Sequence, residues 1–184
     1  VPRSLPRICD PWSSSDQRSR PYHYRRSVIG QRYLRSVSRN YKVHDQEDLH
    51  YLTYATVGWM DVFTRPAYKD ILVESLRYCQ QAKGLELFAW CIMSNHVHLI
   101  ARARPGHRLQ DILRDHKKFT AKAVVKAIEE NPQESRREWL LAHLRTSEGG
   151  IQLWQHDLHP VWLRRTDIIQ QKLRYIHRNP VKEG

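Results

Sequence analysis

The chain has 184 residues and a formal net charge of +12, and 40% of its residues are hydrophobic. This length suits one domain with extensions, and the apolar content suffices for a modest core. No run approaches the ~20 apolar residues of a membrane span, and no secretory signal pattern opens the chain. Three cysteines without a Cys-x-x-Cys pair argue against a disulfide framework and favour a reducing cytoplasm. The charge indicates a polyanionic partner, of which nucleic acid is the commonest.

Residues 1–40 differ in composition from the rest of the chain. They are rich in Ser, Arg and Pro, and residues 1–42 hold ten Lys and Arg against two Asp. Such a stretch lacks the apolar periodicity of a packed domain. We expect it to be either a basic disordered arm that holds DNA or upstream sequence outside the functional protein. Residues 41–184 are then the folded domain.

The first predicted elements of that domain are a strand, a helix and a hairpin. Alternating aromatic and β-branched residues predict a strand over residues 49–58. Thr64, as N-cap, predicts the start of a helix that stops before Gly84. Residues 85–93 and 96–103 predict two strands joined by a tight polar turn.

A second helix, predicted from about Leu109, has an apolar face and a basic face. The apolar face consists of Leu109, Ile112, Leu113, His116 and Phe119. The basic residues are Lys117, Lys118, Lys122 and Lys126. A solvated surface explains any single lysine, but a row of positive charge also fits contact with a phosphate backbone. The order strand, helix, hairpin, helix predicts an α+β fold, a ferredoxin-like sandwich with an antiparallel sheet and helices on one face.

His96 and His98 open the second strand of the hairpin. Residues i and i+2 of a strand point to the same face, so these two imidazoles lie side by side, about 7 Å apart at the backbone. That spacing suits the binding of one metal ion, whereas Val97 and Leu99 face a core. A His-x-His pattern also arises readily by chance, and a pair of satisfied core histidines is the alternative.

A final helix is predicted to begin at Thr166 and to end at Pro180. Its apolar stripe consists of Ile169, Leu173 and Ile176. Tyr175 lies about 200° around the helix from Leu173, at ~100° per residue, so it faces away from that stripe. Asn179 is four residues further on and shares the face of Tyr175. By position alone, this tyrosine is either a surface aromatic or a nucleophile.

Two runs of residues resemble the single-tyrosine HUH transposases of insertion sequences, particularly the REP-associated tyrosine transposases. They are Met93-Ser-Asn-His-Val-His-Leu-Ile100 and Tyr175-Ile-His-Arg-Asn-Pro-Val-Lys-Glu-Gly184. The phrase Leu153-Trp-Gln155 between them is also similar. The likeness extends from about Ser38 to Gly184, and the runs are specific in combination because they occur in this order within the predicted strand and helix pattern.

The resemblance implies a metal-dependent DNA transposase with a C-terminal catalytic helix. Such enzymes cleave and rejoin single-stranded DNA, usually folded into hairpins, through a 5′-phosphotyrosine intermediate. Carried over to this chain, His96 and His98 bind a divalent ion, Mg²⁺ or Mn²⁺. Asn179 is then the third ligand and Tyr175 the nucleophile. The resemblance also implies a homodimer, in some relatives with the tyrosine of one subunit paired with the histidines of the other.

The expected DNA-binding residues are Lys117, Lys118, Lys122, Lys126, Arg174 and Arg178. We expect a cytoplasmic protein, associated with the nucleoid of a bacterium and without a membrane segment. Two other functions stay open. One is a catalytically inactive, nucleic-acid-binding relic of a transposase. The other is a metal-dependent phosphodiesterase in which His96 and His98 activate water and Tyr175 is incidental.

Overall fold

The computed structural model describes residues 47–156, 158 and 160–183. They belong to a compact unit that spans residues 38–184. The stretch predicted to be a basic arm, residues 1–40, lies outside the described residues, and its nature stays a prediction.

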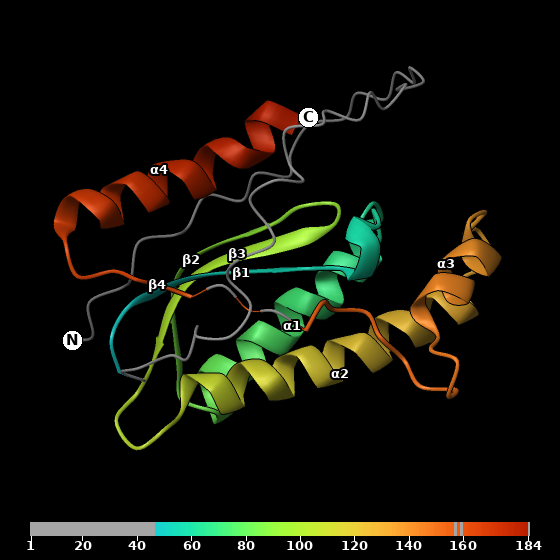
Figure 1. The fold of residues 1–184 in the computed structure, drawn as a ribbon, viewed down its shortest axis with the longest axis horizontal. Coiled ribbons are helices and arrows are strands. Elements are labelled where there is room, and N and C mark those ends of the chain that lie inside the picture. Colours follow the sequence, from blue (N-terminus) through green and yellow to red (C-terminus); the bar gives the residue numbers. More distant parts are fainter. Residues whose placement is uncertain (1–46, 157, 159, 184) are drawn as a thin grey trace, which may run out of the picture. The chain divides into compact units, whose positions relative to one another are not determined.

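Four antiparallel strands form one sheet in the order β2-β3-β1-β4 (Figure 1). The strands are β1 His50–Ala55, β2 Leu85–Ile92, β3 His96–Ala103 and β4 Val161–Trp162. Strand β3 therefore lies between β1 and β2. The register sets His98 of β3 opposite Thr53 of β1 and Cys91 of β2.

Helices cover both faces of this sheet (Figure 1). They are α1 Pro66–Ala82, α2 Leu109–Glu130, α3 Arg137–Leu144 and α4 Thr166–Glu183. Val97 and Leu99 of β3 join the core formed with α1 and α2, whereas Ile100 packs with Ile176 of α4 on the other face. The predicted α+β sandwich, with a separate C-terminal helix, is confirmed. None of the helices in the described ranges is long and apolar enough to cross a membrane.

Two predicted boundaries near the start of the domain are wrong. Strand β1 ends at Ala55, and Val57–Trp59 forms a short 3-10 turn, η2, in which Gly58 has φ of 63°. The residue that precedes the first turn of α1 is Arg65 rather than Thr64. The Thr64 hydroxyl instead accepts a hydrogen bond from Arg136 at 2.7 Å, so it does not cap the helix.

Two predictions about later helices are also wrong. Phe119 is 58% exposed, because at 100° per residue it falls on the margin of the apolar stripe of α2, where Thr120 is buried instead. Helix α4 continues past Pro180 to Glu183. A proline removes one helical hydrogen bond, but it does not oblige the helix to stop there.

Candidate active site

His96 and His98 project from the face of β3 that α4 covers. Their Nε2 atoms are 3.0 Å apart, and their ring centroids are 4.6 Å apart at an interplanar angle of 76°. The two nitrogens converge on one point, as the i, i+2 spacing requires. Such a pair can share one proton, or it can offer two lone pairs to one cation.

The environment of His98 favours its neutral form. The residue is 3% exposed, and its Nδ1 lies 2.8 Å from the Tyr51 hydroxyl and 2.9 Å from the Thr53 hydroxyl. Burial lowers the pKa of His98 to about 4, and the charges of His96 and Lys172 act in the same direction. At neutral pH His98 is therefore an uncharged imidazole that has a lone pair for a cation.

The orientation of His96 is set by the turn between β2 and β3. Its Nδ1 lies 2.7 Å from Asn95 Oδ1, and an amide oxygen can only accept a hydrogen bond. Nδ1 therefore donates, and in the neutral ring the lone pair belongs to Nε2, which faces His98. The Asn95 amide is fixed in turn, because its Nδ2 donates to the Asp61 carboxylate at 3.0 Å and to the Trp59 carbonyl oxygen at 3.3 Å.

Helix α4 brings Tyr175 to this histidine pair. Ile176, which is buried, and Leu173, which is half-buried, pack α4 onto the sheet beside Tyr51. The Tyr175 ring then lies 5.3 Å from the His98 ring and 6.3 Å from the Tyr51 ring, centroid to centroid. Tyr175 is 46% exposed, and its ring meets the His98 ring edge to face, at an interplanar angle of 71°.

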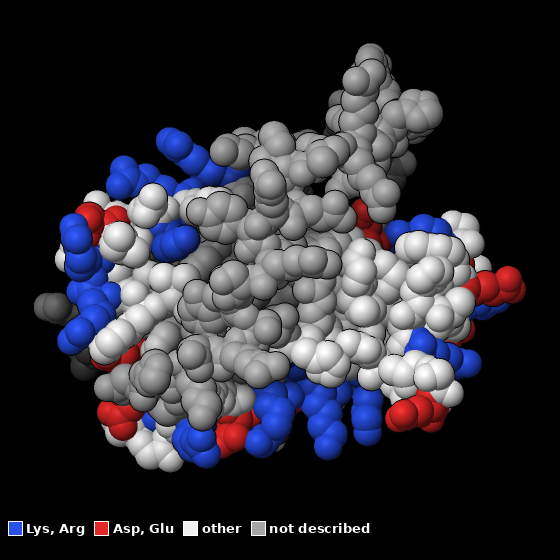
Figure 2. All heavy atoms as spheres, viewed as in Figure 1, with Lys and Arg blue, Asp and Glu red and all other residues white. Residues whose placement is uncertain are grey.

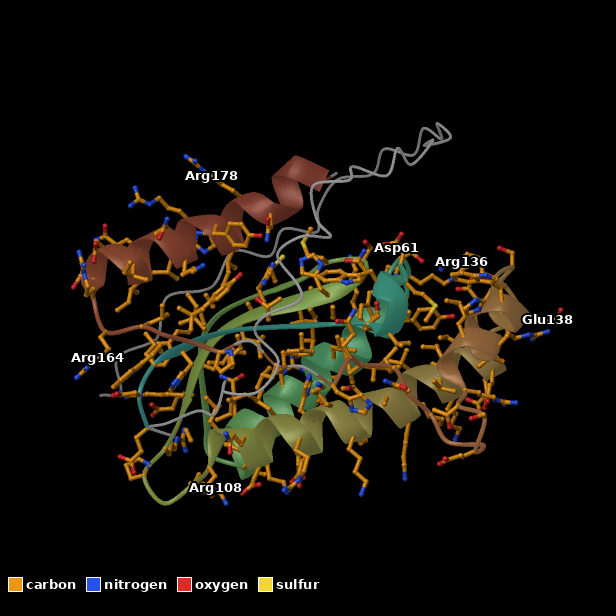
Figure 3. The ribbon with its side chains drawn as sticks, viewed as in Figure 1. Asp61, Arg108, Arg136, Glu138, Arg164 and Arg178 are labelled. Atoms are coloured by element: carbon orange, nitrogen blue, oxygen red, sulfur yellow. The ribbon has the colours of Figure 1, made fainter. Side chains whose placement is uncertain are left out.

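Two predicted arginines lie in a pocket with this tyrosine. Gln171, Arg174, Tyr175, Arg178 and Asn179 line an open pocket of about 350 Å³. Arg178 projects from the side of α4 that faces away from the sheet (Figure 3). The Nδ2 atom of Asn179 is buried and makes no hydrogen bond with any of the described residues. A buried amide nitrogen without a partner is uncommon, and here it belongs to a residue that lines the same pocket as Tyr175.

Lys172 adds a cation on the side of α4 that meets the sheet. Its ammonium nitrogen lies 4.5 Å from the centre of the Tyr51 ring and 5.9 Å from the centre of the Tyr175 ring. Cations over aromatic rings are held by the electron density of the ring face. Sequence reasoning missed Lys172, Tyr51 and Thr53. The signal for Lys172 was its position three residues before Tyr175, whereas the two β1 residues could be found only from the strand register.

The predicted lysines of α2 lie on the other side of the sheet. Figure 2 shows Lys and Arg side chains along the edge that α2 forms in Figure 1. The structure therefore does not bring them together with His98 and Tyr175. Lys117 is half-buried, and its ammonium donates to the Gln155 carbonyl oxygen at 2.8 Å. The exposed members are Lys118, Lys122 and Lys126.

Among the described residues, no group of three His, Cys, Asp or Glu forms a metal cluster. A cation at the His96–His98 pair would need oxygen ligands from an amide, from water or from a substrate. Asn179 is the amide that the family resemblance implies as a ligand, and its Nδ2 atom has no hydrogen-bond partner among the described residues.

The chain is similar to solved structures of known proteins. The chain matches a solved structure of a REP-associated tyrosine transposase bound to a REP hairpin, with a TM-score of 0.58 and 17% identity over 80% of this chain and 74% of that chain. It also matches the crystal structure of a proposed transposase from Deinococcus radiodurans R1, with a TM-score of 0.46 and 23% identity over 76% of this chain and 96% of that chain. No curated protein matches the chain.

A family comparison matches the central part of the sequence. Residues 55–143 match the family described as transposase IS200 like. The matched segment contains His96 and His98, strands β2 and β3, and helices α1 and α2. It begins at the last residue of β1 and ends before α4, which carries Tyr175. Over this segment, the chain is similar to the IS200-like transposases.

Proposed function

We propose that this protein is a transposase that cleaves and rejoins single-stranded DNA, with Tyr175 as its nucleophile. The observation that carries the proposal is the 5.3 Å between the ring centroids of Tyr175 and His98, two residues that lie on different elements. The alternative of an incidental surface tyrosine does not explain why α4 sets a half-exposed phenol against a converging histidine pair.

Tyr175 is a better nucleophile candidate than Tyr51, which also touches His98. Tyr51 is 6% exposed, and burial raises its pKa to about 12, although a hydrogen bond from Thr53 acts in the opposite direction. Its phenol therefore stays protonated and out of reach of DNA. Tyr175 is 46% exposed, so of the two tyrosines it is the one that a phosphodiester can reach.

The donor set fits a divalent ion held by His96, His98 and Asn179. Two neutral imidazoles and one amide oxygen leave the full charge of the ion uncompensated, and bound there it would act as a Lewis acid on a phosphate oxygen. Magnesium prefers oxygen ligands, whereas manganese accepts imidazole nitrogen more readily. We therefore propose that Mn²⁺ binds this set more tightly than Mg²⁺.

The proposed cleavage step forms one bond and breaks one bond. The Tyr175 hydroxyl loses its proton, its oxygen attacks the phosphorus, and the bond from phosphorus to the 3′ oxygen breaks. The 3′ oxygen takes up a proton, so the step is balanced. The products are a 5′-phosphotyrosine and a free 3′-hydroxyl group. Because the phosphodiester energy is kept in the new link, the reverse step can rejoin DNA without a nucleotide cofactor.

Three cations of α4 support binding of the scissile phosphate. Lys172 is close to the Tyr175 ring, and Arg174 and Arg178 share its pocket. We propose that these side chains neutralise the DNA backbone at the site. The α2 lysines lie on the opposite face, so in this proposal they contact only DNA that extends beyond the cleavage site.

The proposed substrate is single-stranded DNA that carries a hairpin. A protein with a similar fold has been seen bound to a REP hairpin, which makes hairpin DNA the first substrate to test. A homodimer and a cytoplasmic, nucleoid-associated location are part of the same proposal.

A covalent-adduct assay tests the proposal. The full chain is incubated with hairpin-bearing single-stranded DNA and Mn²⁺, and then denatured and separated by electrophoresis. We expect a protein–DNA adduct in the wild type and none in Tyr175→Phe. Tyr78→Phe, a change at another exposed tyrosine, is the matched control and should retain the adduct. Cleavage without an adduct would replace the proposal with a phosphodiesterase, and DNA binding without cleavage would replace it with an inactive relic.

A further inference from the structure

The turn η2 holds an exposed tryptophan in an unusual backbone conformation. Trp59 has φ of 57°, and it is the only residue other than glycine with positive φ among the described residues. A bulky side chain rarely adopts this left-handed region, because its Cβ crowds the backbone. The ring is nevertheless 52% exposed, so the fold gains little burial in return for the strain.

The turn between β2 and β3 holds this conformation from one side. The Thr56 amide donates to the Asn95 carbonyl oxygen at 2.8 Å, and the Asn95 side chain donates to the Trp59 carbonyl oxygen at 3.3 Å. The same Asn95 side chain accepts from His96. One amide therefore fixes both the Trp59 backbone and a metal-ligand candidate.

The phrase Leu153-Trp-Gln155 holds the turn from the other side. The Val57 amide donates to the Leu153 carbonyl oxygen at 2.9 Å, and the Gln155 side chain donates to the Thr56 carbonyl oxygen at 3.0 Å. Trp154 between them is buried. A strained conformation persists when its surroundings determine it this fully, and such residues gather at functional sites.

The Trp59 ring is fixed next to the histidine pair. Its centroid lies 5.7 Å from the His96 ring centroid, at an interplanar angle of 65°. Aromatic rings exposed beside a basic nucleic-acid site serve as platforms on which bases stack, and such stacking tolerates any sequence because every base has a π face. A single-stranded substrate has unpaired bases available for it.

We propose that Trp59 stacks on a base of the single-stranded DNA, at a nucleotide that adjoins the scissile phosphate. This inference rests on the proposed function, because it takes DNA at the His96–His98 pair as given. Trp59 positions the substrate and takes no part in the bond-breaking step. The hydrogen bonds that hold the left-handed turn keep the Trp59 ring exposed and prevent it from packing into the core.

A double-mutant cycle between the tryptophan and the base tests this proposal. Binding of single-stranded DNA is measured by fluorescence anisotropy in a Tyr175→Phe background, which prevents turnover. The DNA is either intact or carries one abasic nucleotide at each position in turn. Trp59→Ala should weaken binding of intact DNA about tenfold. It should weaken binding less than about twofold when one particular nucleotide beside the cleavage position is abasic.

Two further variants separate the ring from the backbone. Trp59→Asn removes the ring but tolerates positive φ, so it should bind DNA as weakly as Trp59→Ala and melt at the same temperature as the wild type or higher. Trp59→Phe should recover most of the binding. Trp139→Ala removes another exposed tryptophan, which also contacts a histidine, and should leave binding unchanged.

The outcomes distinguish this inference from the proposed function. Unchanged DNA binding in Trp59→Ala, or the same loss with every abasic substrate, would overturn the stacking proposal while leaving the adduct assay untouched. A large fall in melting temperature in Trp59→Asn would make Trp59 a structural residue instead. Loss of the covalent adduct in the wild type bears only on the proposed function, because the binding cycle uses a protein without the Tyr175 hydroxyl.

Discussion

His116 and His98 are both buried histidines, and they lie on opposite faces of the sheet. His116 is 1% exposed, and its two ring nitrogens meet the hydroxyls of Tyr54 and Ser75, each at 2.9 Å. His98 is 3% exposed and also has hydroxyls at its Nδ1, but its Nε2 faces the Nε2 of His96. Burial lowers the pKa of each to about 4.

The difference shows which property distinguishes a ligand from a core residue. A lowered pKa and burial are common to both histidines, so neither identifies a site. Both ring nitrogens of His116 have neutral hydrogen-bond partners, so neither nitrogen is left to bind a ligand. His98 has a nitrogen that converges with a second histidine and lies beside a half-exposed tyrosine. Convergence of two ring nitrogens, rather than a lowered pKa, is what makes His98 and not His116 the proposed ligand.

Replacing each histidine should give opposite results, and this is the largest expected effect. His98→Ala should lower Mn²⁺ affinity more than 100-fold. It should change the free energy of unfolding by less than about 2 kcal/mol, because the Tyr51 and Thr53 hydroxyls that it leaves can bond to each other. His116→Ala should keep the metal affinity and lose about 2–5 kcal/mol, because it leaves a cavity and two unpaired buried hydroxyls. Calorimetric metal titration and chemical denaturation measure the two effects. A large loss of stability in His98→Ala would make His98 a core residue like His116.

Acid should weaken the fold through His116. Its pKa is near 6.5 in the unfolded chain and about 4 in the folded protein, so below pH 6.5 the unfolded state binds a proton that the folded state does not. Stability is therefore fully present above pH 6.5 and is lost as the pH falls toward 4, by up to about 3 kcal/mol. Denaturation of the metal-free protein at several pH values measures this loss.

His116→Gln is the control for this pH dependence. Glutamine can still bond to the hydroxyls of Tyr54 and Ser75 but does not titrate. The loss of stability at low pH should be smaller in this variant, and the loss that remains should be the part that His98 contributes. The same loss in variant and wild type would contradict the account of His116.

The hydroxyls at His98 Nδ1 should matter most in combination. Either Tyr51→Phe or Thr53→Val leaves one hydroxyl partner, so each alone should reduce Mn²⁺ affinity about threefold. The double variant should reduce it about 10- to 100-fold, because the ring loses its orientation. Tyr54→Phe removes the matching hydroxyl at His116 and should cost stability without changing metal affinity. If the wild type, the two single variants and the double variant bound Mn²⁺ equally tightly, the Tyr51 and Thr53 hydroxyls would have no role in positioning His98.

The smallest effect is expected on the face of the sheet that carries His116. Replacing Lys118, Lys122 and Lys126 together with Gln should weaken binding of a short hairpin-bearing DNA by less than about threefold, because α2 lies away from the cleavage site. Replacing Arg174 and Arg178 together should weaken binding of the same DNA about tenfold. It should also lower the slope of log affinity against log salt concentration by the amount that about two phosphate contacts contribute. Anisotropy at several salt concentrations checks both. A larger effect from the α2 lysines would move the main DNA path to the other face.

The sequence predicts most of the scaffold because its signals are local. The alternation through Val97, His98 and Leu99 predicts both the strand and its two faces, and the apolar spacing from Leu109 predicts α2. Predicted boundaries of elements were wrong where a residue distant in the sequence binds the boundary residue, as when Arg136 donates to the Thr64 hydroxyl. The prediction that Phe119 is buried was wrong because the apolar stripe of α2 is one position narrower than predicted.

The candidate site was less predictable, because its parts come from separate elements. Spacing alone identified His96 and His98 as a pair, but their meeting with Tyr175 was expected only from family resemblance. Tyr51 enters the site through the register of β1 against β3. The positive φ of Trp59 depends on hydrogen bonds from two segments distant in the chain, so no local pattern could indicate it.

Mapping the residue that carries the DNA tests the central claim most directly. The full chain is incubated with hairpin-bearing single-stranded DNA and Mn²⁺, digested with protease and nuclease, and examined by mass spectrometry. The account predicts a nucleotide joined through its 5′-phosphate to Tyr175 and to no other residue. A link on any other side chain would contradict the assignment of the nucleophile, and cleaved DNA without any link would contradict covalent catalysis by this protein.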